Sequence, residues 1–290
     1  MKKLFCILTL CVLAVCSFCA CGKKADDSDL GNSQMSGEIT VVSREEGSGT
    51  RDAFTTLMKI TDAQGNDITY DAAEITNSTS VMLATVSGNK RAIGYVSIGS
   101  LSDDVKTVSV DATMPSAENV KNGKYKIARP FNICYKEGEL SDLAADFESF
   151  IMSDKGQGIV EEEGYISIDT DAFYTASGLS GKLSLAGSTS VAPVMEALAD
   201  EYKKLNSDVT VEIQQSGSSA GISSAIEGVC DFGLSSRDLK DSEKASLIQK
   251  KIAMDGIAVV VNNANPAEDI TSENIRAIFT GEITDWSEVK

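Results

Sequence analysis

Short apolar runs alternate along the chain with segments whose apolar residues recur every three or four positions. The runs are rich in valine and isoleucine and are typical of buried strands, whereas the spaced segments are typical of amphipathic helices. This alternation predicts an α/β fold with mainly parallel sheets. The predicted strands cover residues 39–42, 91–98, 125–135, 182–186, 209–214, 231–235 and 257–262. The predicted helices cover residues 51–57, 81–86, 143–151, 193–205, 222–228, 242–250 and 275–279.

Four of the predicted strands end in loops rich in serine, threonine and glycine. These loops cover residues 43–50, 187–192, 216–221 and 236–238, and two of them contain an arginine, Arg44 or Arg237. Each loop leads into a helix, whose first N–H groups have no partner within the helix and whose dipole attracts negative charge. One such loop is typical of an ordinary capped helix, with Arg44 paired to a neighbouring glutamate. Four in one chain, at the ends of strands where α/β proteins bind ligands, indicate convergence on a small anion.

Composition excludes several other classes of function. The formal charge of −17 over 290 residues argues against nucleic acid, which is bound by clustered lysine and arginine. The chain contains no histidine, so the GSSAG sequence at 217–221 lacks the usual base of a serine hydrolase. No Walker A motif occurs, so nucleotide hydrolysis is left to another subunit. We therefore expect a binding protein that is not an enzyme and uses neither cofactor nor metal.

The N-terminus predicts export. Residues 1–20 form a secretory signal, with two lysines followed by an apolar run too short to span a membrane. Small residues precede Cys21, which resembles the lipidated cysteine of a bacterial lipoprotein; a plain cleaved signal with a free Cys21 is the alternative. Residues 21–36 are polar and predict a flexible tether. Cys134 and Cys230 lie in apolar runs typical of buried thiols, and whether they meet is left open.

Several motifs together resemble one family, the phosphate-binding lipoproteins of bacterial phosphate ABC transporters. They are ITVVSREEGSGTRDAF, RAIGYVSIGSL, GSTSVAPVMEALADEY, QQSGSSAG, DFGLSSRDL and AIFTGEITDWSEV, and the resemblance covers residues 37–290. It implies a two-lobed periplasmic-binding-protein clamp of type II that closes on phosphate by a hinge motion. It also implies a lipid-anchored monomer on the extracytoplasmic face of the cell membrane, with the permease and ATPase subunits of an ABC importer as partners.

The resemblance assigns the ligand-binding residues one by one. Ser190 and Val191 would bind the anion through backbone N–H groups and the Ser190 hydroxyl, and Ser218 would donate its hydroxyl. Arg44 would be the charged clamp, held by an adjacent acid, for which Glu46 is the first choice. The start of the helix in the opposite lobe would be supplied by Ser48, Gly49 and Thr50.

Ser236 departs from the family pattern, because many members have an aspartate there that accepts the phosphate proton. A buried carboxylate selects hydrogen phosphate over sulfate, which has no proton to donate. With Ser236 in its place, the hydroxyl or a carbonyl must accept, and Arg237 would add a second positive group. Phosphate remains the expected ligand on the overall match, and discrimination against sulfate or arsenate is left open by this sequence.

Segment order is the second departure. In the family GSTSVAP comes early and SREEGSGT follows in mid-chain, whereas here SREEGSGT comes first. This order predicts a circular permutation with one lobe of residues 37–122 plus 266–290 and the other of 123–265. A fragment cut from a tandem arrangement would give the same order.

Phosphate import is the first functional hypothesis. The alternatives are a receptor for another oxyanion, such as sulfate or molybdate, and a surface adhesion or signalling module on the same fold.

Overall fold

The computed structural model describes residues 35–289. The predicted signal segment 1–20, the proposed lipidation site Cys21 and nearly all of the tether 21–36 lie outside the described residues. The described residues form one compact unit.

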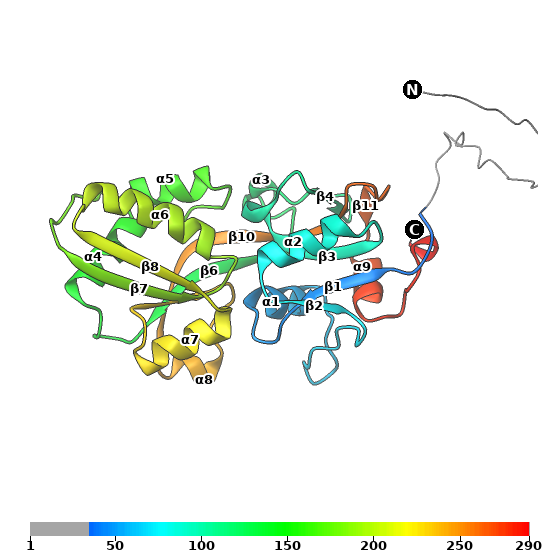
Figure 1. The fold of residues 1–290 in the computed structure, drawn as a ribbon, viewed down its shortest axis with the longest axis horizontal. Helices are drawn as coiled ribbons and strands as arrows, with labels where there is room; N and C mark the ends of the chain where they lie inside the picture. Colours follow the sequence, from blue (N-terminus) through cyan, green and yellow to red (C-terminus); the bar gives the residue numbers. More distant parts are fainter. Residues whose placement is uncertain (1–34, 290) are drawn as a thin grey trace, which may run out of the picture. The chain divides into compact units, whose positions relative to one another are not determined.

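Strands and helices alternate along this unit as expected for an α/β protein (Figure 1). The strands are β1 Thr40–Arg44, β2 Glu74–Thr76, β3 Ala92–Ser97, β4 Val105–Thr107, β5 Ser109–Val110, β6 Ala128–Tyr135, β7 Gly181–Gly187, β8 Val209–Gln215, β9 Phe232–Ser235, β10 Ile248–Asn262 and β11 Asp269–Ile270. The α-helices are α1 Gly49–Leu57, α2 Thr79–Gly88, α3 Ala117–Lys121, α4 Asp142–Ile151, α5 Asp154–Glu162, α6 Ala192–Leu205, α7 Ser218–Glu227, α8 Asp241–Lys244 and α9 Ser272–Phe279. Two 3-10 turns cover Ile98–Ser100 and Trp286–Glu288.

The main sheet has the strand order β2-β1-β3-β10-β6-β9-β7-β8, and β4 also pairs with β10. Its outer pairs are parallel, as predicted, but β10 is antiparallel to β3, β4 and β6, and β6 is antiparallel to β9. The expectation of mainly parallel sheets is therefore wrong at the centre. Figure 1 shows β6 and β10 running side by side through the middle of the fold.

The predicted helix 242–250 is also wrong in its second half. Helix α8 ends at Lys244, and β10 begins at Ile248 instead of Ile257. From Ile248 to Gly256 the chain pairs with β6, with a bulge between Lys251 and Ala253. This strand pairing outweighs the helical propensity of a lysine-rich segment.

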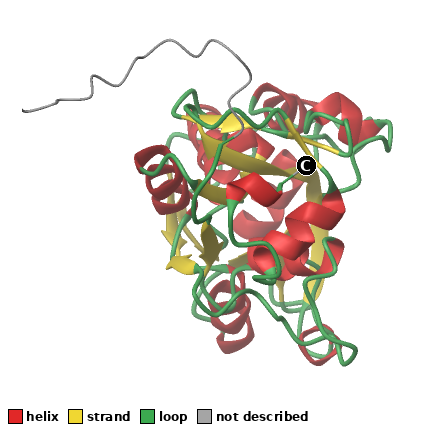
Figure 2. Cartoon of the chain, turned by 90° about the vertical axis from the view of Figure 1, so that its right-hand side faces the viewer, coloured by secondary structure: helices red, strands yellow, loops and turns green. Residues whose placement is uncertain are grey.

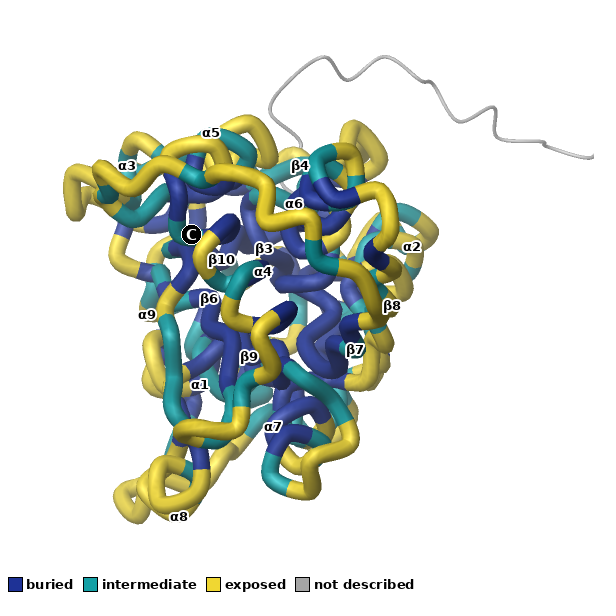
Figure 3. The backbone as a smooth tube through the Cα atoms, turned by 90° about the vertical axis from the view of Figure 1, so that its left-hand side faces the viewer, coloured by how far each residue is buried: buried dark blue, intermediate teal, exposed yellow. Residues whose placement is uncertain are grey.

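The two largest groups of buried apolar side chains form most of the core. The first group contains Phe147, Leu198 and Phe232 and lies between the helices α4–α6 and the strands β6, β7 and β9. The second contains Phe54 and Phe279 and lies among α1, α9, β1, β3 and β10. Figure 2 shows helices packed in front of the strands and beside them, and Figure 3 shows the buried backbone concentrated along β3, β6, β9 and β10.

Strand β10 belongs to both groups, because Ile252 and Ala253 are members of the first group and Ile257 is a member of the second. A similar change occurs at the start of β6, where Ile127 belongs to the second group and Phe131 belongs to the first. Our division into two lobes, 37–122 plus 266–290 and 123–265, stays a prediction.

Helix α7 packs directly on β7 through glycine. A Cβ atom on Gly221 would lie 2.3 Å from the carbonyl oxygen of Ala186 and 2.5 Å from the Cα of Gly187. Both atoms belong to the strand backbone and have little freedom to move. The close approach places the first turn of α7 beside the carboxyl end of β7.

We predict that Gly221→Ala destabilises the protein by about 1–3 kcal/mol, because the added methyl overpacks against β7. The matched control is Gly158→Ala in α5, where a Cβ would meet no heavy atom within 4 Å. It should stabilise the protein by about 0.5–1 kcal/mol through lower unfolded-state entropy. Urea unfolding measures both values, and equal stability of the two variants would contradict the packing described for α7.

Candidate functional site

The four loops singled out in the sequence lie at the carboxyl ends of β1, β7, β8 and β9, and lead to α1, α6, α7 and α8. A fifth strand end joins them, because β2 pairs in parallel with β1 and leads into α2. Parallel pairing of β1 with β2 and of β7 with β8 and β9 brings the helix starts to common edges. The polar side chains of these loops are therefore neighbours in space.

Hydroxyl groups from α1, α2 and the loop before α6 bind one another. The Oγ1 of Thr50 lies 2.9 Å from the Oγ of Ser190. The Oγ1 of Thr79 lies 3.2 Å from the Oγ1 of Thr189 and 3.4 Å from the Oγ of Ser190. Each of these side chains is buried. A hydroxyl both donates and accepts, so these side chains can bind a ligand atom that accepts a hydrogen bond or one that donates it.

A second group of hydroxyls continues the first. The Oγ of Ser188 donates to the Oγ of Ser236 at 3.0 Å, and the backbone N–H of Ser236 donates to the Oγ of Ser218 at 3.1 Å. Gly49 lies against this group, because a Cβ there would be 2.4 Å from the Oγ of Ser218 and 2.7 Å from the Oγ of Ser236. Only glycine fits at the start of α1. We call the two groups together the hydroxyl cluster: Thr50, Thr79, Ser188, Thr189, Ser190, Ser218 and Ser236.

Arg44 is the cation of the hydroxyl cluster. Its side chain is 2% exposed, and its Nη2 donates to the Oγ1 of Thr189 at 3.1 Å. The same guanidinium donates twice to Glu45, from Nε at 2.8 Å and from Nη2 at 2.9 Å. Glu46 was the expected partner, and that expectation is wrong. Glu45 still follows β1, with its N–H bound to the carbonyl of Thr76, whereas Glu46 is exposed in the turn.

Tyr95 contacts both the end of β1, where Arg44 lies, and helix α1. Its ring stacks on Phe54 of α1 with centroids 4.0 Å apart, and its hydroxyl lies 2.9 Å from the Oγ of Ser43. The N–H of Arg44 donates to the same hydroxyl at 3.3 Å. Burial raises the pKa of Tyr95 to about 12, so the phenol stays protonated and able to donate. The end of β1 is therefore fixed relative to α1.

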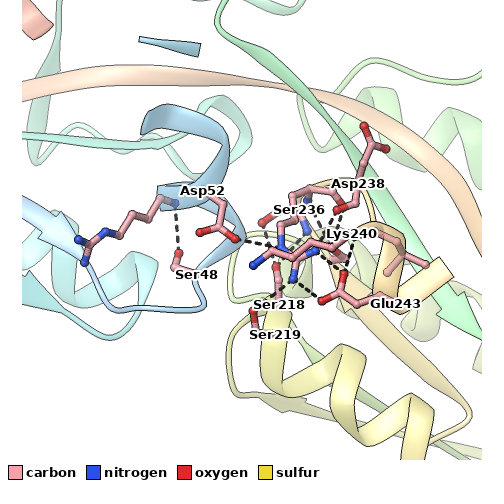
Figure 4. A network of polar contacts seen from close by, with 12 residues as sticks. Ser48, Asp52, Ser218, Ser219, Ser236, Asp238, Lys240 and Glu243 are labelled. Atoms are coloured by element: carbon pink, nitrogen blue, oxygen red, sulfur yellow. Dashed lines mark hydrogen bonds and ion pairs between the residues drawn. The ribbon is translucent and has the colours of Figure 1, made fainter. Parts of the chain in front are cut away.

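Arg237, the second arginine of these loops, is bound mainly by acidic side chains. Its Nη1 and Nη2 donate to the two carboxylate oxygens of Glu243 at 2.7 and 2.8 Å, and its Nη2 also donates to Ser219. Its Nε is 3.0 Å from the Oδ2 of Asp52 (Figure 4). Burial raises the pKa of Asp52 above its ordinary value, although Arg237 acts in the opposite direction. Acidic side chains thus hold this guanidinium beside the hydroxyl cluster.

Ser48 and Val191 make contacts within their own loops. The Oγ of Ser48 accepts from the N–H of Arg51 at 3.4 Å and caps α1, and the N–H of Val191 donates to the carbonyl of Ser188. Of the nine predicted binding residues, the structure brings Arg44, Gly49, Thr50, Ser190, Ser218 and Ser236 into contact with the hydroxyl cluster.

Thr79, Ser188 and Thr189 belong to the hydroxyl cluster but were not predicted as site residues from the sequence. Thr79 begins α2 after a strand of three residues, which is too short to recognise by pattern. The usable signal is the sequence Asn77–Ser80, which resembles the other Ser/Thr loops.

A buried ion pair next to the hydroxyl cluster was also not predicted from the sequence. The Nη2 of Arg129 is 3.0 Å from the Oδ2 of Asp255, whose Oδ1 accepts from Ser97 at 2.7 Å. The Nη1 of Arg129 reaches the carbonyl of Ser236 at 3.4 Å. Burial raises the pKa of Asp255 to about 6, against the lowering effect of Arg129. The sequence signal that could have found this pair is a charged residue, Arg129 or Asp255, inside each of two apolar runs.

The geometry favours binding over catalysis. The Oγ of Ser218, the serine of the GSSAG sequence, contacts the N–H and hydroxyl of Ser236, and neither is a base. Residues 35–289 contain no cluster of three or more His, Cys, Asp or Glu suited to a metal ion. Cys134 and Cys230 are both free thiols, which answers the question of their pairing. In the described part of the chain, no helix has the length and apolarity needed to cross a membrane.

Comparisons with known proteins agree with this geometry. The family model for the PBP superfamily domain matches residues 26–155 and 174–290. The phosphate-binding protein PstS 2 of Streptococcus agalactiae serotype V is 47% identical over 285 residues, which cover 97% of each chain. PstS 2 of Streptococcus pneumoniae serotype 4 is 44% identical over 290 residues, which cover 98% of each chain.

The similarity extends to a solved structure. A crystal structure of a phosphate-binding protein of a phosphate ABC transporter from Streptococcus pneumoniae TIGR4 superposes with a TM-score of 0.70 at 46% identity. The match covers 88% of this chain and 100% of that one. The chain therefore belongs to the PBP superfamily and, within it, to the family of phosphate-binding proteins of phosphate ABC transporters.

Proposed function

We propose that this protein captures inorganic phosphate and delivers it to the permease of an ABC importer. One observation carries the proposal: buried hydroxyls from the starts of α1, α2, α6 and α7 meet in a single cluster beside Arg44. Such a site suits a small anion with several oxygens, because each oxygen accepts from a different helix start. The family consists of substrate-binding proteins of transporters, not of enzymes, which agrees with the lack of a base at Ser218.

Binding in this site depends on aligned donors more than on net charge. Glu45 already neutralises Arg44, and Glu243 and Asp52 neutralise Arg237. The anion would therefore be held by helix dipoles, N–H groups and hydroxyls, which act strongly where water is excluded. This arrangement explains how a chain with a formal charge of −17 can bind an anion.

The finer features of the proposal concern location and assembly. We propose a lipid anchor on Cys21, a position on the extracytoplasmic face of the membrane, a monomeric state, and partnership with permease and ATPase subunits. The family membership and the export signal predicted from the sequence support them.

We also propose that the segment order is a circular permutation. The two ends of the described chain lie side by side, since the N–H of Ile39 donates to the carbonyl of Thr284 and that of Trp286 to the carbonyl of Gly37. Adjacent termini are what a permuted chain requires.

A broader oxyanion receptor is the second candidate, and Ser236 favours it. The side chain is fully buried, and its Oγ lies near two other hydroxyls, Ser188 at 3.0 Å and Ser218 at 3.3 Å. A hydroxyl can satisfy a bare sulfate oxygen as well as a phosphate hydroxyl, whereas a carboxylate satisfies only the latter. Sulfate is therefore the first competitor to test.

Arg44→Ala should abolish tight phosphate binding. The variant removes the cation and leaves Glu45 unpaired near the anion, a loss we expect to exceed about 2 kcal/mol, or roughly 30-fold in Kd. Isothermal titration calorimetry with inorganic phosphate measures it. Arg276→Ala is the control. Arg276 lies on α9 and pairs with Glu282, so the variant removes the same charge from a residue that is not part of the site. Unchanged affinity in folded Arg44→Ala would favour an adhesion or signalling module on this fold.

Ser236→Asp should raise the preference for phosphate over sulfate. Both anions meet the same added charge, but only hydrogen phosphate can donate to the new carboxylate, so the affinity ratio should rise roughly tenfold or more. Calorimetric titration with each anion gives the ratio. The control is Ser223→Asp, at an exposed position of α7. An unchanged ratio of phosphate to sulfate affinity would show that the side chain at position 236 does not accept a hydrogen bond from the anion.

A further inference from the structure

Arg237 connects elements that belong to different core groups. Arg237 follows β9, whose Phe232 lies in the first core group. Its guanidinium donates two hydrogen bonds to Glu243 of α8. Its remaining nitrogen, Nε, lies 3.0 Å from Asp52 of α1, the helix that buries Phe54 in the second group (Figure 4). The ion pair between Asp52 and Arg237 therefore bridges the two halves of the core.

The two charges of this bridge are shielded from water but poorly aligned. The Arg237 side chain is 7% exposed and that of Asp52 is 33% exposed. The Nε of Arg237 and the Oδ2 of Asp52 are both buried, and neither has a partner that meets hydrogen-bond geometry. Their attraction is therefore largely Coulombic, which tolerates small changes in angle. A contact of this kind forms and breaks more readily than an aligned hydrogen bond.

A second bridging contact depends on the same arginine. The Nη2 of Arg237 donates to the Oγ of Ser219 at 3.2 Å, and the N–H of Ser219 donates to the carbonyl of Gly47 at 3.0 Å. Gly47 lies in the loop before α1, so this bond also joins the two halves. Figure 4 shows Asp52 approaching the polar network of Ser219, Ser236 and Glu243 from the side of α1.

The bridge lies on one flank of the hydroxyl cluster. A cavity of about 690 Å³ opens at that flank, lined by Asp52, Asp67, Arg237 and Lys240 among others. The side chains of Arg237 and Asp52 form no hydrogen bond with a member of the hydroxyl cluster. Their contact with each other joins the two halves, so it bears on a bound anion through the relative position of those halves.

We propose that the Asp52–Arg237 ion pair is a latch, formed when the two lobes close, that sets how slowly the anion leaves. Glu243 is the positioning residue that holds the Arg237 guanidinium toward Asp52. The proposal rests on the proposed function, in which closure of two lobes encloses phosphate. A contact made only in the closed state stabilises that state and slows release without touching the ligand.

The first test measures the dissociation rate of radiolabelled inorganic phosphate from the full chain. Asp52→Asn should release phosphate roughly tenfold faster, which corresponds to about 1.4 kcal/mol. Asp52→Glu keeps the charge and should restore most of the slow release. Asp67→Asn is the matched control, because Asp67 lines the same cavity but pairs with Arg51 of α1 and does not bridge the halves. Its release rate should equal that of the wild type.

The second test needs no ligand. Hydrogen exchange at the amide of Ser219 reports the bridging bond to Gly47, and Asp52→Asn should accelerate it in phosphate-free protein, whereas Asp67→Asn should not. Exchange at Ser219 that is equal in Asp52→Asn and the wild type overturns the latch, as does an unchanged release rate. A wild type that binds no phosphate overturns the proposed function instead, and the exchange comparison then decides the latch by itself.

Discussion

Polar groups that are buried together must find hydrogen-bond partners, and this requirement determines how the site is built. Several helix starts come together away from water, each with a buried hydroxyl. Every unpaired member would cost about 1–3 kcal/mol. Thr50 meets this requirement through Ser190, and Ser218 through Ser236, so each pair holds two different elements together. An anion with several oxygens satisfies the same groups in a different way, which is why this arrangement suits binding.

The long strands β6 and β10 provide the frame on which these helix starts are carried. Both pass between the two core groups, and Arg129 of β6 pairs with Asp255 of β10 at the point where the groups meet. A buried ion pair adds little net stability, but removing one partner is costly, so the pair favours one arrangement over its alternatives. Arg129 also reaches the carbonyl of Ser236, and so connects the frame to the hydroxyl cluster.

Local patterns in the sequence predicted the parts of the site that depend on local structure. A strand, a Ser/Thr/Gly loop and a helix are recognisable within about a dozen residues, and this located the loops that contain Thr50, Ser190 and Ser218. The family resemblance then assigned these three residues to the site. Thr79 escaped because its strand is only three residues long. Whether Glu45 or Glu46 pairs with Arg44 depends on where β1 stops pairing with β2, which no local pattern fixes. The length of β10 was missed for the same reason, since its first half exists only as a partner of β6.

We propose that donors from both halves of the core grip one tetrahedral oxyanion. A crystal structure of the full chain grown with inorganic phosphate would show this grip. We expect a single anion within hydrogen-bond distance of Thr50, Ser190 and Ser218 at once, with the guanidinium of Arg44 beside it. An anion bound by residues of one half alone, with Thr50 and Ser190 still bonded to each other, would rule this grip out.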